Sequence, residues 1–267
     1  MAKQPLVSII IPTYNRAELV TRAIQSALKQ THKNIEIIVI DDCSTDNTEQ
    51  AIKQIKDKRV QYKKNKRNSG APTSRNNGLA QAKGEYINFL DDDDEIHPKK
   101  IELQLKKFNT TKIDRLGVVT CDVEYKRADI QEIKKNRKKG NIYKQLLTSY
   151  CVYGTETMLI RTQAAKEING FDTRLESNQE YDLAIQLAKK YSFDYIPKVL
   201  TTKYETTGQI SFNFNKKING TKTLYNKYKQ EYKTNGVYMY NFLRFSYLLI
   251  KYRIGKYLGK NMYIKLP

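Results

Sequence analysis

Five consecutive acidic residues, 91–95, directly follow the apolar segment 84–90 (GEYINFL). Such a run is typical of a buried strand, so the acids are expected at the tip of that strand. Adjacent carboxylates repel one another, and Mg²⁺ or Mn²⁺, which take hard oxygen ligands, would neutralise part of this charge. Alternate side chains of an extended chain point to opposite sides, so Asp91 and Asp93 would share one side. The spacing therefore predicts two carboxylates directed at one metal-bound substrate.

A purely structural interpretation of the same residues remains open. Asp94 and Glu95 are suited to the first turn of a helix near Ile96, where carboxylates interact with free backbone N–H groups, and the other acids would be solvated. The surrounding sequence favours the chemical interpretation, because polar clusters also follow other strand-like segments.

The elements that would position these acids alternate between strand and helix. Strands are predicted at 6–11, 35–40, 60–63 and 84–90, and helices at 18–30, 49–55 and 73–82. The near-continuous apolar character of the first two strands is typical of parallel strands covered on both faces. The order predicts an α/β fold with a Rossmann-like, mostly parallel, doubly wound sheet. Further along, 154–160 is predicted to be a strand and 126–144 a surface loop or hairpin.

Ligands of open parallel sheets bind outside the carboxyl ends of the strands. Tyr14, Asp42 and Asp93 each follow the carboxyl end of a predicted strand. We therefore expect these three side chains to converge on one site.

The composition of the chain indicates the cellular compartment in which the protein is expected. The three cysteines are scattered and accompanied by two histidines, so they predict neither a zinc site nor a disulfide framework and fit a reducing compartment. The N-terminus shows no signal-peptide pattern, and no apolar run reaches the ~20 residues of a membrane-spanning helix. The expected location is cytoplasmic.

The formal net charge of +20 predicts a polyanionic partner or surface. Residues 215–267 carry twelve Lys and Arg against one acid, Glu231, together with nine tyrosines. Within them, 237–250 (VYMYNFLRFSYLLI) is apolar and aromatic, and its helical wheel is not cleanly amphipathic because Arg244 and Lys251 share one stripe. This composition suits an anionic membrane surface, such as the inner face of the plasma membrane. A homo-oligomer interface and packing against the rest of the chain are the alternatives.

Three segments resemble the nucleotide-sugar domain of family-2 glycosyltransferases, which have a GT-A fold. They are LVSIIIPTYNR at 6–16, IEIIVIDDCSTDNT at 35–48 and NSGAPTSRNNGLAQAKGEYINFLDDDD at 68–94. A further match lies around 177–188. The resemblance implies a catalytic domain at 1–210, with a nucleotide-sugar half at 1–98 and an acceptor half at 99–210, followed by a basic, Tyr-rich helical segment at 211–267.

The resemblance also implies roles for individual residues in binding the nucleotide. The segment that lines the base pocket in this family corresponds to Pro12, Thr13, Tyr14 and Asn15. Tyr14 would stack on uracil and Asp42 would accept the N–H of the base. The alternatives are that Tyr14 packs in the core and that Asp41 or Asp42 caps the next helix. Arg75, in a pattern like the family's Arg-Asn-x-Gly, would bind the anionic diphosphate, the alternative being a surface arginine.

Alignment with the family's D-x-D motif makes Asp93 the ligand of Mn²⁺ or Mg²⁺ and Asp91 the ribose contact, with Asp92 taking the ribose role if the register shifts by one. The metal would act as a Lewis acid on the departing nucleoside diphosphate. Some metal-dependent relatives add a histidine ligand late in the chain, and here His32 and His97 are the only histidines. That third ligand is therefore missing or replaced by water.

The segment SNQEYDL at 177–183 resembles the family's E-D-x-D-L region. The general base of that region maps to Glu180, and Gln179 replaces the first acid. Glycosyl transfer needs such a carboxylate to take the proton of the acceptor hydroxyl. Stabilisation of a helix N-terminus by Glu180, helped by Asp182, is the alternative. A single base opposite a metal-held leaving group predicts inversion at the anomeric carbon.

We therefore expect a metal-dependent hexosyltransferase that moves a hexose or N-acetylhexosamine from a UDP-sugar to a saccharide acceptor, including a lipid-linked one, in surface polysaccharide or glycoconjugate synthesis. A transferase acting on a protein-linked glycan and a non-enzymatic polyanion-binding protein are the alternatives. Nucleic acid is not an expected partner, because the acidic tip would repel phosphates unless a metal intervened.

Overall fold

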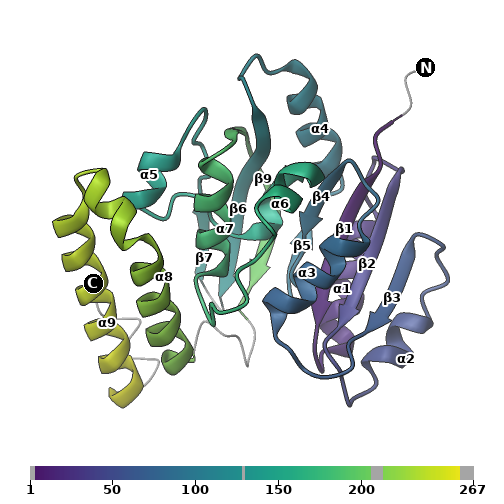
Figure 1. The fold of residues 1–267 in the computed structure, drawn as a ribbon. Helices are drawn as coiled ribbons and strands as arrows, with labels where there is room; N and C mark the ends of the chain where they lie inside the picture. Colours follow the sequence, from purple (N-terminus) through teal and green to yellow (C-terminus); the bar gives the residue numbers. More distant parts are fainter. Residues whose placement is uncertain (1–3, 128–129, 206–212, 259–267) are drawn as a thin grey trace.

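The computed structural model describes residues 4–127, 130–205 and 213–258. Within these ranges one mixed sheet of nine strands forms the centre of the molecule, with helices on both faces (Figure 1). Its spatial order is β3-β2-β1-β4-β8-β6-β9-β5, and β7 pairs with β6 beside this path. The α/β class expected from the alternation of elements is confirmed.

The first half of the chain forms the parallel part of the sheet. Its strands are β1 (Val7–Thr13), β2 (Ile35–Asp41), β3 (Val60–Lys64) and β4 (Tyr86–Phe89), and its helices are α1 (Ala17–Leu28), α2 (Thr48–Lys53) and α3 (Ala71–Gln81). β1 lies between β2 and β4 and is parallel to both. Every residue of β1 and β2 is buried, as expected for strands covered on both faces.

The second half completes the sheet with strands of both directions. Its elements are β5 (Glu95–Ile96), α4 (Lys100–Thr110), β6 (Leu116–Arg127), β7 (Ile130–Lys134), α5 (Tyr143–Thr148), η1 (Thr155–Thr157), β8 (Leu159–Arg161), α6 (Thr162–Glu167), α7 (Gln179–Ala188) and β9 (Ser192–Tyr204). β8 is antiparallel to both β4 and β6, whereas β6 and β9 are parallel to each other. β7, which lies within the segment 126–144 predicted to be a surface loop or hairpin, pairs antiparallel with β6.

Two local predictions are wrong. The segment 154–160 is not one strand, because Gly154 adopts φ +82° and a 3₁₀ turn follows before the short strand β8. No helix starts at Ile96, because Glu95 and Ile96 pair with β9 as β5 and the helix begins only at Lys100.

Alternate residues of the strands fill two cores on opposite faces of the sheet. Ile10 packs in the core beneath α3, α7 and α8, whereas Ile9 and Ile11 pack in the core beneath α1 and α4. This division follows from the two-residue period of side chains in a strand. The sheet is therefore packed against helices on both faces. The carboxyl ends of its parallel strands are held in place by this packing.

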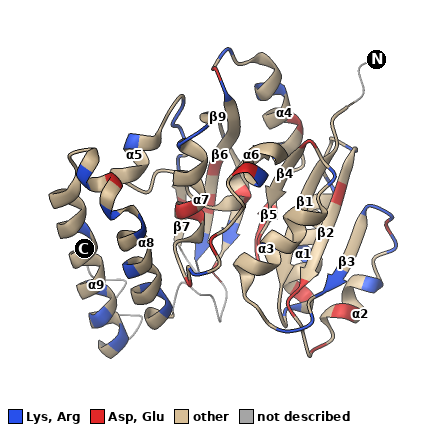
Figure 2. Cartoon of the chain, viewed as in Figure 1, with Lys and Arg blue, Asp and Glu red and all other residues tan. Residues whose placement is uncertain are grey.

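The helical, basic C-terminal region is confirmed as a hairpin of α8 (Phe214–Thr234) and α9 (Tyr238–Leu258). Gly236 turns the chain between them with φ +71°. The two helices lie side by side at one end of the molecule, and Lys and Arg occur along both (Figures 1 and 2). Among the residues described here, no helix has the length and apolar character needed to cross a membrane.

Candidate active site

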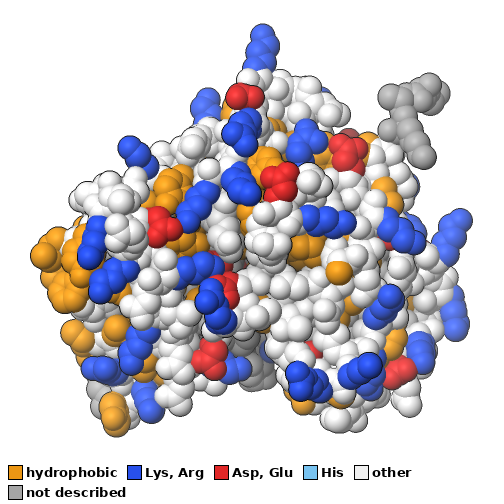
Figure 3. Space-filling model, in the orientation of Figure 1, with side chains coloured by type: hydrophobic (Ala, Val, Ile, Leu, Met, Phe, Trp, Pro, Cys, Tyr) orange, Lys and Arg blue, Asp and Glu red, His pale blue; other side chains and the backbone are white. Residues whose placement is uncertain are grey.

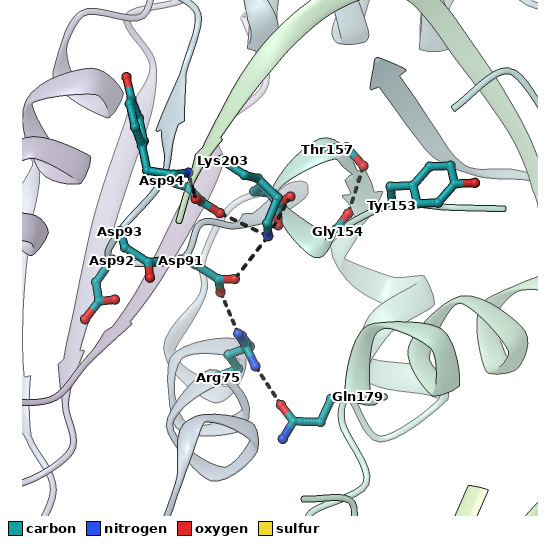
Figure 4. A network of polar contacts seen from close by, with 12 residues as sticks. Arg75, Asp91, Asp92, Asp93, Asp94, Tyr153, Gly154, Thr157, Gln179 and Lys203 are labelled. Atoms are coloured by element: carbon teal, nitrogen blue, oxygen red, sulfur yellow. Dashed lines mark hydrogen bonds and ion pairs between the residues drawn. The ribbon is translucent and has the colours of Figure 1, made fainter. Parts of the chain in front are cut away.

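The acid run leaves the extended conformation directly after β4. The N–H of Asp94 donates to the carbonyl oxygen of Asp91 at 3.2 Å, which closes a turn. The turn directs Asp92 and Asp93 toward Arg16. It directs Asp91 and Asp94 toward Lys203, as Figure 4 shows. The expected pairing of Asp91 with Asp93 on one side is therefore wrong, because side chains in a turn do not keep the period of a strand.

The first half of the acid run is held by the end of β1 and the loop after it. Arg16 Nη1 lies 2.9 Å from Asp92 Oδ1 and 3.1 Å from Asp93 Oδ2. The hydroxyl of Thr13 donates to Asp92 at 2.8 Å. Burial raises the pKa of Asp92 to about 6, although Arg16 opposes the shift. Arg16 was not singled out from the sequence, although the family-like segment PTYNR contains it.

The second half of the acid run surrounds a buried ammonium group. Lys203, near the end of β9, places its Nζ 3.0 Å from Glu156 Oε1, 3.1 Å from Asp94 Oδ2 and 3.7 Å from Asp91 Oδ2. Burial raises the pKa of Glu156 to about 7 and that of Asp94 well above its usual range, against the opposing effect of Lys203. Burial alone would lower the pKa of Lys203, but the carboxylates outweigh it and raise that pKa.

Sequence reasoning missed both Glu156 and Lys203. A lone acid inside the otherwise uncharged segment GTETMLI was the available signal for Glu156. Nothing distinguishes Lys203 from the other members of a set of 48 Lys and Arg.

The donor set around the acid turn suits a hard divalent cation. One carboxylate oxygen each from Asp91, Asp94 and Glu156 lies within 4.8 Å of the others. Glu156 Oε2 is buried without a hydrogen bond from the described residues, whereas Asp94 Oδ2 and Glu156 Oε1 are paired with Lys203 Nζ. Carboxylate oxygens are the ligands that Mg²⁺ and Mn²⁺ take in proteins, so the residues present fit such an ion.

Arg75 connects the acid turn to the acceptor half of the chain. It lies in α3 with only 6% of its surface exposed, so the alternative of a surface arginine is wrong. Its guanidinium donates to Asp91 Oδ1 at 2.5 Å and to Gln179 Oε1 at 2.9 Å, and it lies 5.2 Å from the ring centre of Phe171. Burial would lower the pKa of Arg75, but the nearby carboxylates, first Asp91 and then Glu180, raise it.

Glu180 lies in the first turn of α7, next to Gln179, and is half-buried. No hydrogen bond or ion pair reaches its carboxylate from the part of the chain that the structure describes. Its charge also contributes to the raised pKa values of Tyr125 and Tyr150, for which burial is the main cause. The carboxylate of Glu180 thus has no hydrogen-bond or ion-pair partner among the described residues.

Asp182 on the same helix has a different environment. It is fully buried and accepts from the hydroxyl of Tyr228 at 2.7 Å and from Gln186 at 2.8 Å. Lys227 Nζ lies 2.7 Å from the same carboxylate. Asp182 therefore fixes α8 to α7 rather than stabilising the helix N-terminus together with Glu180.

The predicted base-pocket residues lie at the carboxyl ends of β1 and β2. Pro12 and Thr13 are buried in β1, whereas Tyr14 is 42% exposed and so does not pack in the core. Asn15 adopts φ +52°, and its side-chain oxygen accepts from the backbone N–H of Thr45 at 2.8 Å. The exposed ring of Tyr14 is available for stacking.

Asp42 organises the loop that leads into α3. Its carboxylate accepts from Asn65 Nδ2 at 2.8 Å, from the backbone N–H of Ser69 at 3.0 Å and from that of Gly70 at 2.7 Å. The alternative that Asp42 caps α2 is wrong, because α2 begins after Asn47. Among the described residues, no hydrogen bond or ion pair joins Tyr14 or Asp42 to the acid turn, so the predicted residues form two neighbouring groups at one edge of the sheet.

Comparison with known proteins identifies what this arrangement resembles. The family model of glycosyl transferase family 2 matches residues 8–168. A glycosyltransferase of Rickettsia felis is 36% identical over 206 residues, which are 75% of this chain and 34% of that protein, so the chain spans about a third of that relative. The glycosyl transferase WcaA of Escherichia coli, named for colanic acid biosynthesis, is 29% identical over 250 residues, covering 87% of this chain and 84% of WcaA.

A third relative has a more specific name. WfaP of Escherichia coli, a UDP-Glc:α-D-GlcNAc-diphosphoundecaprenol β-1,3-glucosyltransferase, is 48% identical over 108 residues, covering 40% of this chain and 43% of WfaP.

Solved structures share the fold. TarS 1–349 of S. aureus in complex with UDP-GlcNAc has a TM-score of 0.63 at 21% identity and covers 82% of this chain and 66% of its own. The mannosyltransferase PcManGT of Pyrobaculum calidifontis, in complex with GDP-Man and Mn²⁺, has a TM-score of 0.68 at 18% identity and covers 97% of this chain and 77% of its own.

Proposed function

Because the chain belongs to glycosyl transferase family 2 and has a GT-A fold, we propose that it transfers a hexose or N-acetylhexosamine from a UDP-sugar to a saccharide acceptor with inversion. One observation carries the proposal. The buried guanidinium of Arg75 bonds the acid turn at Asp91 and also bonds Gln179, the neighbour of Glu180. The donor-side acids and the candidate base are thereby held in a fixed relation.

The nucleotide binds at the carboxyl edge of β1 and β2. Tyr14, with its exposed ring, stacks on the uracil, and the loop held by Asp42 lies beside it. Asp91 or Asp92 contacts the ribose. UDP-glucose is the donor in the name of WfaP, which supports a uridine nucleotide for this chain.

The diphosphate is bound beside the acid turn, whose carboxylates are paired with Arg16 and Arg75. Asp93, the ligand that the motif implies, or the carboxylates of Asp91, Asp94 and Glu156 would hold Mn²⁺ or Mg²⁺. Such an ion would supply Lewis-acid stabilisation of the departing diphosphate. Arg16 and Arg75 add fixed guanidinium groups on either side of the turn, which suit phosphate oxygens.

Glu180 takes the proton of the acceptor hydroxyl. Its carboxylate accepts no hydrogen bond from the described residues, so it is available to a hydroxyl that approaches the donor sugar. A single carboxylate in this position gives direct displacement and hence inversion. The acceptor is a saccharide of surface polysaccharide synthesis, including a lipid-linked one, as the names of WcaA and WfaP support.

The test is binding and turnover of a panel of UDP-sugars, with Mn²⁺ and with EDTA. Asp93→Ala is expected to abolish metal-dependent donor binding. Glu180→Gln is expected to keep donor binding and to reduce transfer by about 10²–10⁴-fold, the usual contribution of a general base. Glu176→Gln, on the exposed loop before α7, is the matched control and should transfer normally.

Failure of every UDP-sugar to bind under any condition would overturn the proposed donor class. Normal turnover by Glu180→Gln would instead retain the donor and reject Glu180 as the base.

A further inference from the structure

The outward side of α9 carries an apolar surface that no described part of the chain covers. We propose that this surface, here called the α9 face, docks on an anionic lipid bilayer. The α9 face consists of Met239, Tyr240, Phe242, Leu243, Tyr247, Ile250 and Tyr257, whose exposed fractions range from 47% to 82%. The space-filling view shows hydrophobic side chains gathered over the hairpin at this end of the molecule, with Lys and Arg beside them (Figure 3).

Helix geometry places the centre of the α9 face on one stripe. Successive residues of an α-helix are rotated by about 100°, so Met239, Leu243, Ile250 and Tyr257 fall within about 40° of one another. Asn241 and Phe245, which are buried, lie on the opposite side. The apolar stripe therefore points away from α8, and burying it requires another surface. Exposed apolar patches of this kind mark sites of interaction.

The inner side of α9 is firmly packed, so its orientation is fixed. The ring of Phe245 lies 5.3 Å from that of Tyr225 and 6.0 Å from that of Tyr232, both on α8. Arg244 donates to the hydroxyl of Tyr181 on α7 at 3.1 Å. The sequence of α9 is not cleanly amphipathic because it contains Arg244. This residue points inward to Tyr181 of α7, so the outer stripe remains apolar.

The basic residues of α9 favour an anionic bilayer as the partner of the α9 face. Arg253 and Lys256 are exposed at one edge of the stripe, and Lys251 lies at the other edge. α9 itself contains no Asp or Glu, since the last acid of the sequence is Glu231. An apolar stripe with basic edges matches the boundary between acyl chains and anionic headgroups. A second copy docked on this face would instead bring like charges together.

Docking would also orient the candidate active site. Arg244 of α9 contacts Tyr181, the residue after Glu180, so the membrane-facing helix and the helix of the proposed base form one packed unit. The orientation of Glu180 toward a lipid-linked acceptor rests on the proposed function. Binding to vesicles does not rest on it, since it needs neither donor nor acceptor.

The experiment is co-sedimentation of the full chain with vesicles of phosphatidylglycerol and phosphatidylcholine, compared with pure phosphatidylcholine. Binding is expected only with the anionic lipid and is expected to weaken at high salt. Leu243→Ser with Ile250→Ser should weaken partitioning about a hundredfold, roughly tenfold for each buried aliphatic side chain. Arg253→Gln with Lys256→Gln should weaken it roughly 25-fold, about fivefold for each basic residue near anionic lipid.

The matched control is Ile130→Ser with Ile133→Ser on β7, whose side chains are 65% and 51% exposed. This pair should leave vesicle binding unchanged. Because all of the substituted aliphatic side chains are exposed, both double variants should unfold at the wild-type temperature. Equal binding by Leu243→Ser/Ile250→Ser and wild type, or no binding to anionic vesicles, overturns the proposal. A wild-type dimer that this double variant splits into monomers would show that a second copy covers the α9 face, and would equally overturn it.

Discussion

Replacement of Lys227 by Met tests how the C-terminal hairpin is fixed to the catalytic part of the chain. Lys227 Nζ lies 2.7 Å from the carboxylate of Asp182, which is fully buried, and 2.8 Å from that of Asp172. Removing one partner of a buried ion pair costs about 3–5 kcal/mol, because the other charge stays buried. The Lys227 side chain is 21% exposed, and Tyr228 and Gln186 still donate to Asp182. We therefore expect the lower end, about 3 kcal/mol of unfolding free energy.

The assay is equilibrium unfolding in urea, supported by thermal melts. A loss of about 3 kcal/mol corresponds to roughly 6–12 °C in Tm for a chain of this size. Lys189→Met is the matched control, because the Lys189–Glu231 pair also joins α7 to α8, with 38% and 28% of the two side chains exposed. Such a pair contributes about 0.2–1 kcal/mol.

A double variant identifies the physical cause of the loss. Lys227→Met with Asp182→Asn removes both charges and keeps the buried site neutral, so it should regain most of the lost stability. Equal losses for Lys227→Met and Lys189→Met would refute the reasoning from burial. A double variant no more stable than Lys227→Met would refute the unpaired carboxylate as the cause.

Three further outcomes are expected. Arg75→Lys should reduce kcat/KM about tenfold in the UDP-sugar assay. The single ammonium nitrogen of lysine cannot bond both Asp91 and Gln179 as the guanidinium does, and the loss of one charged hydrogen bond costs about 1.5 kcal/mol. Unchanged kinetics would contradict the bridging role of Arg75. Gly154→Ala should destabilise the fold more than Gly140→Ala: both glycines have positive φ, but a Cβ at Gly154 would lie 1.8 Å from Glu156 Oε1, whereas at Gly140 nothing lies within 4 Å. Similar melting temperatures for the two variants would contradict this prediction and show that the Glu156 side chain moves away from the added Cβ at little cost. EDTA should lower transfer by more than about a hundredfold and Mn²⁺ should restore it, as expected for Lewis-acid stabilisation of the leaving group; activity that survives EDTA would point to the guanidinium and ammonium groups instead.

The sequence by itself determined the arrangement of the first half of the chain. The apolar runs at 6–11 and 35–40 and the polar residues after them are local patterns, and the period and length of such patterns fix strand, turn and helix. Short connections between strands and helices predicted parallel strands, and β1 to β4 are parallel to their neighbours among themselves. For the same reason the acid run, Asp42 and Tyr14 were placed correctly at the carboxyl edge of the sheet.

Tertiary structure decided which charges meet. Glu156 and Lys203 are separated from the acid turn by about 60 and 110 residues of chain. The pairing of β9 with β5 and β6 places Lys203, and the hydrogen bond from Asn88 of β4 to the backbone of Glu156 holds η1 beside the turn. The turn after β4 likewise divides the acids between Arg16 and Lys203, against the alternation that an extended chain would give. A single lysine or glutamate has no local period or spacing that marks it as buried. Its environment arises only when distant strands pack, and so the neutralisation of this acidic site is a property of the fold rather than of any one segment.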